Sequence, residues 1–124
     1  MPYELDFESH PFVRVRVHGV DTLSDMVERI RRVVSHPSWR PGRGVLIDMR
    51  EASTASFSNE ELHKIHDMHA IMKEAMGDSK LALVASVGPA FGVARMWEGL
   101  AESGLQVSVS AFDNCEDAEV WLGE

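Results

Sequence analysis

The sequence predicts an α/β domain with a five-stranded, mostly parallel sheet and the element order β-β-α-β-α-β-α-β-α. Two apolar runs of strand length, residues 45–47 and 81–85, stand between segments whose apolar residues recur at helical spacing. The first residues of the chain instead alternate apolar and charged side chains, as the strands of a hairpin do. Because the connections are short, right-handed crossovers between parallel strands are expected after the hairpin.

Length and charge limit the classes of protein. A chain of 124 residues is long enough for one domain with its own core, and we expect a single domain over residues 1–124. Its net charge of −8 repels phosphate backbones, which argues against a nucleic-acid partner. The single cysteine, the acidic N-terminus and the lack of a long apolar run predict a cytoplasmic protein with no internal disulfide, signal peptide or membrane span.

The hairpin is expected to place the first strand at an antiparallel edge beside the second strand, at about residues 12–18. Both strands have one apolar and one charged face, so an acidic row lies beside a basic row. We interpret this charged face as a solvated sheet surface. The alternative is an arginine patch that binds an anion. The apolar residues that alternate are Tyr3, Leu5, Phe7, Val13, Val15 and Val17.

The first helix is predicted to begin after Thr22, an N-cap residue with Asp25 three positions on, and to end before Pro37. Its apolar residues recur at helical spacing, and its other side is expected to face solvent. Trp39, in the loop that follows, is expected to cover the core. The side predicted to be solvated carries Glu28, Arg29, Arg31 and Arg32.

The central strand is predicted over residues 44–50, followed by a loop rich in hydroxyl groups at Ser53, Thr54, Ser56 and Ser58. Ser58 and Glu61 fit a capping box for a second helix that runs to Gly77. Three histidines in that helix recur every third residue, so they turn around the helix axis and do not converge on a metal ion. We therefore expect no metal site and no cofactor. The histidines are His63, His66 and His69.

Two further strands complete the sheet, at about residues 80–86 and 105–111, the last half exposed and hence an edge. A helix follows each strand, and the last is expected over residues 114–122. The glycines near Pro89 match neither the Rossmann nor the P-loop pattern for phosphate binding. Cys115 stands at the start of the last helix, where the helix dipole favours a thiolate, but no histidine is paired with it for catalysis.

Four segments carry a resemblance to a known family when they are read in order. They are Thr22-Leu23-Ser24-Asp25, Arg40-Pro41-Gly42 before Val45-Leu46-Ile47-Asp48-Met49-Arg50, Phe91-Gly92-Val93-Ala94-Arg95-Met96, and Asp117-Ala118-Glu119-Val120-Trp121-Leu122. In order and spacing they resemble bacterial SpoIIAA-like proteins, small domains of STAS and SEC14 type. The resemblance spans nearly the whole chain and implies sequential parallel strands with helices predominantly on one side.

The resemblance implies a protein that is not an enzyme. Relatives include anti-sigma-factor antagonists, which bind a kinase and are switched by phosphorylation of a serine capping the helix after the central strand, and domains that hold a lipid. Ser58 is the nearest match to that serine and is the candidate phosphorylation site. The antagonists have an Asp-Ser-Ser-Gly type of run there. This chain has Phe57-Ser58-Asn59-Glu60-Glu61 instead, whose carboxylates would repel an added phosphate.

Three hypotheses for function follow. The first is a non-enzymatic regulatory or protein-interaction domain of STAS type, which could also form a homodimer. The second is a carrier of a small apolar, lipid-like ligand. The weakest is a hydrolase, because the sequence has no G-x-S-x-G motif. The expected binding site lies where the parallel strands end. Alternatively, the phenylalanines there only cover the core. The candidate site residues are Asp48, Arg50, Phe57, Ser58, Ser86, Phe91 and Phe112.

Overall fold

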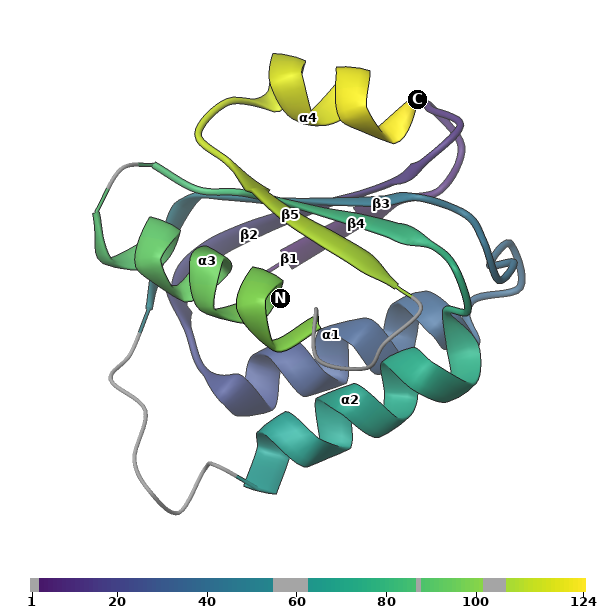
Figure 1. Cartoon of the computed structure of the whole chain (residues 1–124), viewed down its shortest axis with the longest axis horizontal. Coiled ribbons are helices and arrows are strands. Elements are labelled where there is room, and N and C mark those ends of the chain that lie inside the picture. The colour runs from purple at the N-terminus through teal and green to yellow at the C-terminus, as the bar shows by residue number, and fades with distance from the viewer. Residues whose placement is uncertain (1–2, 55–62, 87, 102–106) are drawn as a thin grey trace.

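The computed structural model describes residues 3–54, 63–86, 88–101 and 107–124, in which strands and helices alternate as predicted (Figure 1). The strands are β1 (Tyr3–Asp6), β2 (Val13–Asp21), β3 (Val45–Thr54), β4 (Lys80–Val84) and β5 (Ser108–Phe112). The helices are α1 (Leu23–Ser35), α2 (His63–Ala75), α3 (Pro89–Ala101) and α4 (Cys115–Leu122).

The five strands lie in the sheet in the order of the chain, β1-β2-β3-β4-β5. β1 pairs antiparallel with β2, and every later pair is parallel. The sheet is therefore wound in one direction, because each right-handed crossover adds the next strand on the same side. The predicted fold, including the antiparallel first strand at one edge and β5 at the other, is confirmed.

The helices cover the two faces of the sheet unequally. α1, α2 and α3 lie on one side, called the front face, and α4 lies alone on the other, the back face (Figure 1). Alternation along the strands sends Val15 and Ile47 into the front core and Leu46 and Val84 into the back core. Each fully buried aliphatic side chain contributes about 1.5–3 kcal/mol, so the larger front core contributes most of the stability.

β2 and β3 are longer than predicted. Their parallel pairing continues as far as Asp21 and Thr54, so Ser53 and Thr54 belong to the strand rather than to the loop. The register of this pairing shifts between Arg16 and His18: Arg16 pairs with Asp48, whereas His18 pairs with Glu51. Such a bulge adds a residue to one strand and changes the direction of the side chains that follow.

The capping box of α1 is confirmed. The Thr22 hydroxyl accepts from the Asp25 backbone N–H at 3.1 Å, and the Asp25 carboxylate accepts from the Thr22 N–H at 3.2 Å. The prediction of a solvated charged side is wrong for Arg29, which is only 3% exposed, and holds for its neighbours. Arg29 is buried because the extended β2 brings Asp21 beneath α1, and the two side chains form an ion pair at 2.9 Å.

Trp39 and α4 each close one side of the molecule. Trp39 packs against the front core and donates from Nε1 to the Ala75 carbonyl at 3.0 Å, so the prediction that it covers the core is confirmed. On the back face, the Asn114 side chain caps α4 by accepting from the Asp117 N–H at 2.8 Å. Trp121 then packs over the back core, where it lies beside Phe112.

Candidate functional site

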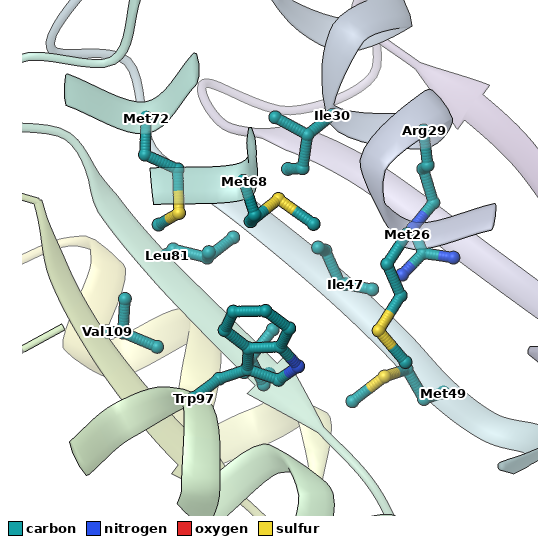
Figure 2. A pocket seen from close by; sticks show the side chains of 11 residues that line it. Met26, Arg29, Ile30, Ile47, Met49, Met68, Met72, Leu81, Trp97 and Val109 are labelled. Carbon is teal, nitrogen blue, oxygen red and sulfur yellow. The ribbon is translucent and has the colours of Figure 1, made fainter. Parts of the chain in front are cut away.

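An apolar pocket lies between the helices of the front face and the sheet (Figure 2). α1, α2 and α3 converge there, and β3, β4 and β5 form its floor. A water-sized molecule can place its centre in about 30 Å³ of this space, and the wider opening of about 480 Å³ includes open solvent. This front pocket is lined by Met26, Arg29, Ile30, Ile47, Met49, Met68, Met72, Leu81, Leu83, Trp97 and Val109.

Methionines make up much of the wall of the front pocket. Met26 comes from α1, Met49 from β3, and Met68 and Met72 from α2. Met68 and Met72 lie above the ring of Trp97 in this view, and Met26 and Met49 lie to one side of it (Figure 2). An unbranched methionine can change rotamer at low cost, so a wall of this composition adapts its shape to what it binds.

Among the described residues that line the front pocket, Arg29 alone carries a charge. Its Nη1 donates to Asp21 Oδ1 at 2.9 Å, and Asp21 is 1% exposed. Two atoms of this buried pair, Arg29 Nε and Asp21 Oδ2, have no hydrogen-bond partner within the described part of the chain. A buried polar atom left unpaired costs about 1–3 kcal/mol. The guanidinium group of Arg29 therefore gives the apolar pocket a polar group with an unused hydrogen-bond donor.

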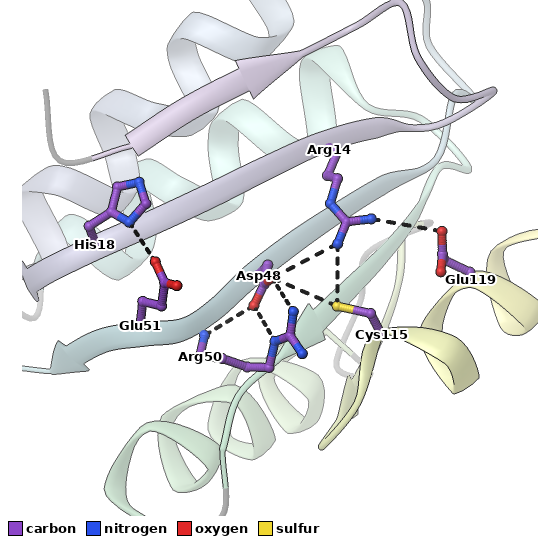
Figure 3. A network of polar contacts seen from close by, with 7 residues as sticks. All are labelled: Arg14, His18, Asp48, Arg50, Glu51, Cys115 and Glu119. Carbon is purple, nitrogen blue, oxygen red and sulfur yellow. Dashed lines mark hydrogen bonds and ion pairs between the residues drawn. The ribbon is translucent and has the colours of Figure 1, made fainter.

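A separate polar network lies on the back face and is centred on Asp48 (Figure 3). Arg50 binds both carboxylate oxygens, from Nη2 to Oδ2 at 2.8 Å and from Nε to Oδ1 at 2.9 Å. Arg14 lies between two carboxylates, 4.0 Å from Asp48 and 3.8 Å from Glu119 of α4. Burial would raise the pKa of Asp48, but the hydrogen bonds from Arg50 and the charges of Arg50 and Arg14 outweigh it and lower the pKa.

Cys115 joins this network at the first turn of α4 (Figure 3). Its Sγ lies 3.6 Å from Arg14 Nη2 and 3.7 Å from Asp48 Oδ2. Burial and the charge of Asp48 raise the pKa of the Cys115 thiol, although the two arginines act in the opposite direction. The thiol therefore stays protonated at neutral pH, which is unfavourable for a nucleophile.

The predicted site residues that the structure describes do not all lie in one place. Asp48 and Arg50 lie within β3 and bind each other on the back face, where Phe112 contacts Trp121 with ring centroids 5.6 Å apart. Phe91 packs against the front core, and Ser86 is exposed after the end of β4. Phe57 and Ser58 lie outside the described residues.

Sequence reasoning missed the front pocket and the Arg29–Asp21 pair. Each apolar residue of the pocket also fits the core-facing side of its own helix or strand, so no single element signals a cavity. The one available signal was the number of methionines at those positions, since methionine is common at adaptable surfaces. Asp21 gave no signal, because its burial depends on how far β2 extends.

The described residues contain neither a candidate metal cluster nor a helix that could span a membrane. No three side chains among His, Cys, Asp and Glu lie together so that they could hold a metal ion. Within the same residues, none of the helices has both the length and the apolar character required to cross a bilayer.

Comparisons with known proteins identify the fold. No family model matches the chain, and no curated protein matches it. A solved structure does match: an uncharacterized protein from the DUF3478 family, with a SpoIIAA-like fold, from Shewanella loihica PV-4. The match has a TM-score of 0.59 and 15% sequence identity, and it covers 97% of this chain and 93% of that protein. The chain has a SpoIIAA-like fold. The likeness extends over nearly the whole of this SpoIIAA-like chain and concerns its fold.

Proposed function

We propose that this SpoIIAA-like chain is a non-enzymatic binding domain that holds a small apolar ligand in the front pocket. The observation that carries the proposal is the pocket itself, an apolar space between the helix layer and the sheet with a wall of methionines and Trp97. Sites for small molecules are typically concave, mostly apolar and equipped with a few polar groups. The front pocket has this composition, with Arg29 as its polar group.

The expected affinity is modest. A ligand that buries about 200 Å² of apolar surface gains about 5 kcal/mol, and the loss of translational and rotational freedom offsets part of that gain. The methionines must also move apart, which costs little for each side chain. We therefore expect binding in the range from about micromolar to millimolar for a simple aliphatic ligand.

Filling the pocket tests this function. The Met68→Trp substitution adds volume to the front pocket and should reduce the binding of an apolar fluorescent dye, 1,6-diphenylhexatriene, by about tenfold or more. The matched control is Met96→Trp, because Met96 is half-buried on α3 and does not line the pocket. Fluorescence titration measures both variants. Failure of the wild-type chain to bind the dye, or equal loss in both variants, would contradict the proposal.

Protein interaction on the back face is a second candidate. α4 packs against β3, β4 and β5 and also contacts Arg14 of β2 through Glu119, whereas Arg16, two residues farther along β2, is exposed. Asp48 and Arg50 of the expected site lie beside this surface. A partner on this surface would recognise its charged side chains, so the Arg16→Glu substitution should abolish binding of a specific partner. The control substitution Lys73→Glu, on α2, should leave that binding unchanged. Sedimentation velocity on the same variants tests whether the partner is a second copy of the chain.

A further inference from the structure

The outer edge of β5 is the side of that strand that faces away from β4. β5 is the last strand of the sheet, and within the described part of the chain no strand pairs with this edge. The N–H of Ser108 and the carbonyl of Phe112 form hydrogen bonds with residues that flank β4, so these two residues direct their backbone groups inward. Backbone groups alternate in direction along a strand, so Val109 and Ala111 direct theirs to the outer edge.

One of these outward groups is bonded to a side chain. The N–H of Ala111 donates to Glu98 Oε2 at 2.7 Å, and Glu98 belongs to α3, which packs against β5 (Figure 1). The second carboxylate oxygen of Glu98, Oε1, lies 3.1 Å from Arg95 Nη1, one turn earlier in the helix. The Glu98 side chain is 19% exposed and that of Arg95 is 60% exposed, so the carboxylate lies on the protein side of this ion pair.

The Glu98 carboxylate takes the place that a carbonyl group of a neighbouring strand would have. Unpaired backbone groups at the edge of a sheet are a template for the addition of another strand, and charged side chains are one means of preventing it. A hydrogen bond to a carboxylate is stronger than one to a neutral carbonyl. A strand that pairs with the outer edge therefore has to displace a better acceptor than the one it supplies.

A second copy of the chain fits the outer edge by symmetry. In an antiparallel pair, two residues that lie opposite each other exchange both of their N–H···O bonds. If Ser110 lies opposite Ser110 of the second copy, Val109 lies opposite Ala111 of that copy, and Ala111 lies opposite Val109. The outward groups of both copies are then paired, and the contact is the same on both sides, as a two-fold interface requires.

We infer that Glu98 prevents the chain from forming a dimer through β5, because its carboxylate occupies the Ala111 N–H that a second copy would bind. Two strands of five residues bury much less than the roughly 1,200 Å² of a small stable interface. The dimer that forms without Glu98 is therefore weak and depends on concentration. The outer edge of β5 is separate from the front pocket, so this role of Glu98 is independent of any ligand there.

Sedimentation velocity of the full chain tests this inference. Glu98→Ala removes the carboxylate, and the chain should change from a monomer to a monomer–dimer equilibrium at about 100 μM. Glu98→Gln keeps an oxygen acceptor on a side chain of the same length, so it should remain monomeric. The matched control is Glu28→Ala, which removes a helix glutamate that pairs with Arg32 at 3.3 Å on α1, and it should also remain monomeric.

Two further variants locate the contact and allow for a loss of folding. In Glu98→Ala/Ser110→Lys, two lysines lie opposite each other at the centre of the strand pair, and like charges there oppose pairing, so the monomer should return. Arg95→Glu keeps Glu98 but repels its carboxylate, and because Arg95 is exposed this variant should fold and form the same dimer. Circular dichroism checks that each variant has the wild-type secondary structure.

Three results would overturn the inference. The first is that folded Glu98→Ala, or Arg95→Glu if Glu98→Ala does not fold, remains monomeric at this concentration. The second is a Glu98→Ala dimer that persists when Ser110→Lys is added, because another surface would then hold the two copies together. The third is a wild-type dimer that Ser110→Lys dissociates, because the outer edge would then be open with Glu98 in place.

Discussion

At the scale of single residues, one carboxylate organises the back face. Asp48 is 6% exposed, yet it remains ionised because Arg50 donates to both of its oxygens and Arg14 adds a second positive charge. The bulge in the pairing of β2 with β3 supports this geometry, since it occurs just after Asp48 and allows the Arg50 N–H to donate to Asp48 Oδ1 at 3.1 Å. A buried charge with this many donors orders the strand around it.

The pKa of Asp48 predicts how stability depends on pH. Its folded pKa is lowered, so its stabilising contribution is complete above the unfolded value of about 3.9 and is lost as pH falls through the lower folded pKa. Asp48→Asn should therefore lower the free energy of unfolding at pH 7, with a difference from wild type that shrinks below about pH 4. Urea denaturation at pH 7 and pH 3 measures this. Asp67→Asn, at an exposed position on α2, is the control and should show no such change. A difference as large at pH 3 as at pH 7 would show that the effect is not electrostatic.

At the scale of the elements, helix caps are the features best predicted from sequence. The Thr22 and Asp25 capping box is local, because both of its hydrogen bonds join residues that are three positions apart. Thr22→Ala should lower the free energy of unfolding by about 1 kcal/mol.

Ser58→Ala should cost about as much, and Ser58→Asp less, if Ser58 caps the helix that precedes Gly77. Thermal unfolding compares the three variants. Should Ser58→Asp abolish binding of a partner and keep the melting temperature, the serine acts as a phosphorylation switch instead.

Features that depend on contacts between distant elements could not be predicted from the sequence. The alternation in β2 and the spacing in α1 predicted both elements correctly, because each pattern repeats within one segment. The burial of Arg29 depends on Asp21, which lies eight residues earlier in the chain at the end of β2. The pairing of β2 with β3 determines how far β2 extends. The site residues Asp48 and Arg50 were expected at the end of a strand over residues 44–50, whereas β3 continues to Thr54. The bulge within this longer pairing has no sequence signature here. The front pocket depends on how three helices meet, which no helix specifies alone.

At the scale of the whole molecule, the sheet separates two cores that share only backbone. The front core holds the residues of α1, α2 and α3, and the back core holds the residues of α4 with Phe12, Leu46, Ala82 and Val84. Side chains on opposite faces of a strand point away from each other, so a change in one core reaches the other only through the sheet. The front pocket and the Asp48 network are separated in this way, and ligands of the two faces should bind independently.

Mutational additivity tests this separation. Val33 of α1 is fully buried in the front core, and Leu122 of α4 packs against the back core. Val33→Ala and Leu122→Ala should each cost about 2 kcal/mol, and the double variant should equal their sum within about 0.5 kcal/mol, because the sites share no partner. The comparison pair is Phe112→Leu and Trp121→Leu, whose rings lie 5.6 Å apart in the back core and should couple by about 0.5–1.5 kcal/mol. Urea denaturation of all six variants gives both coupling energies. A coupling between Val33 and Leu122 as large as that between the two rings would mean that the sheet transmits strain from one face to the other, and that a ligand in the front pocket changes the back face.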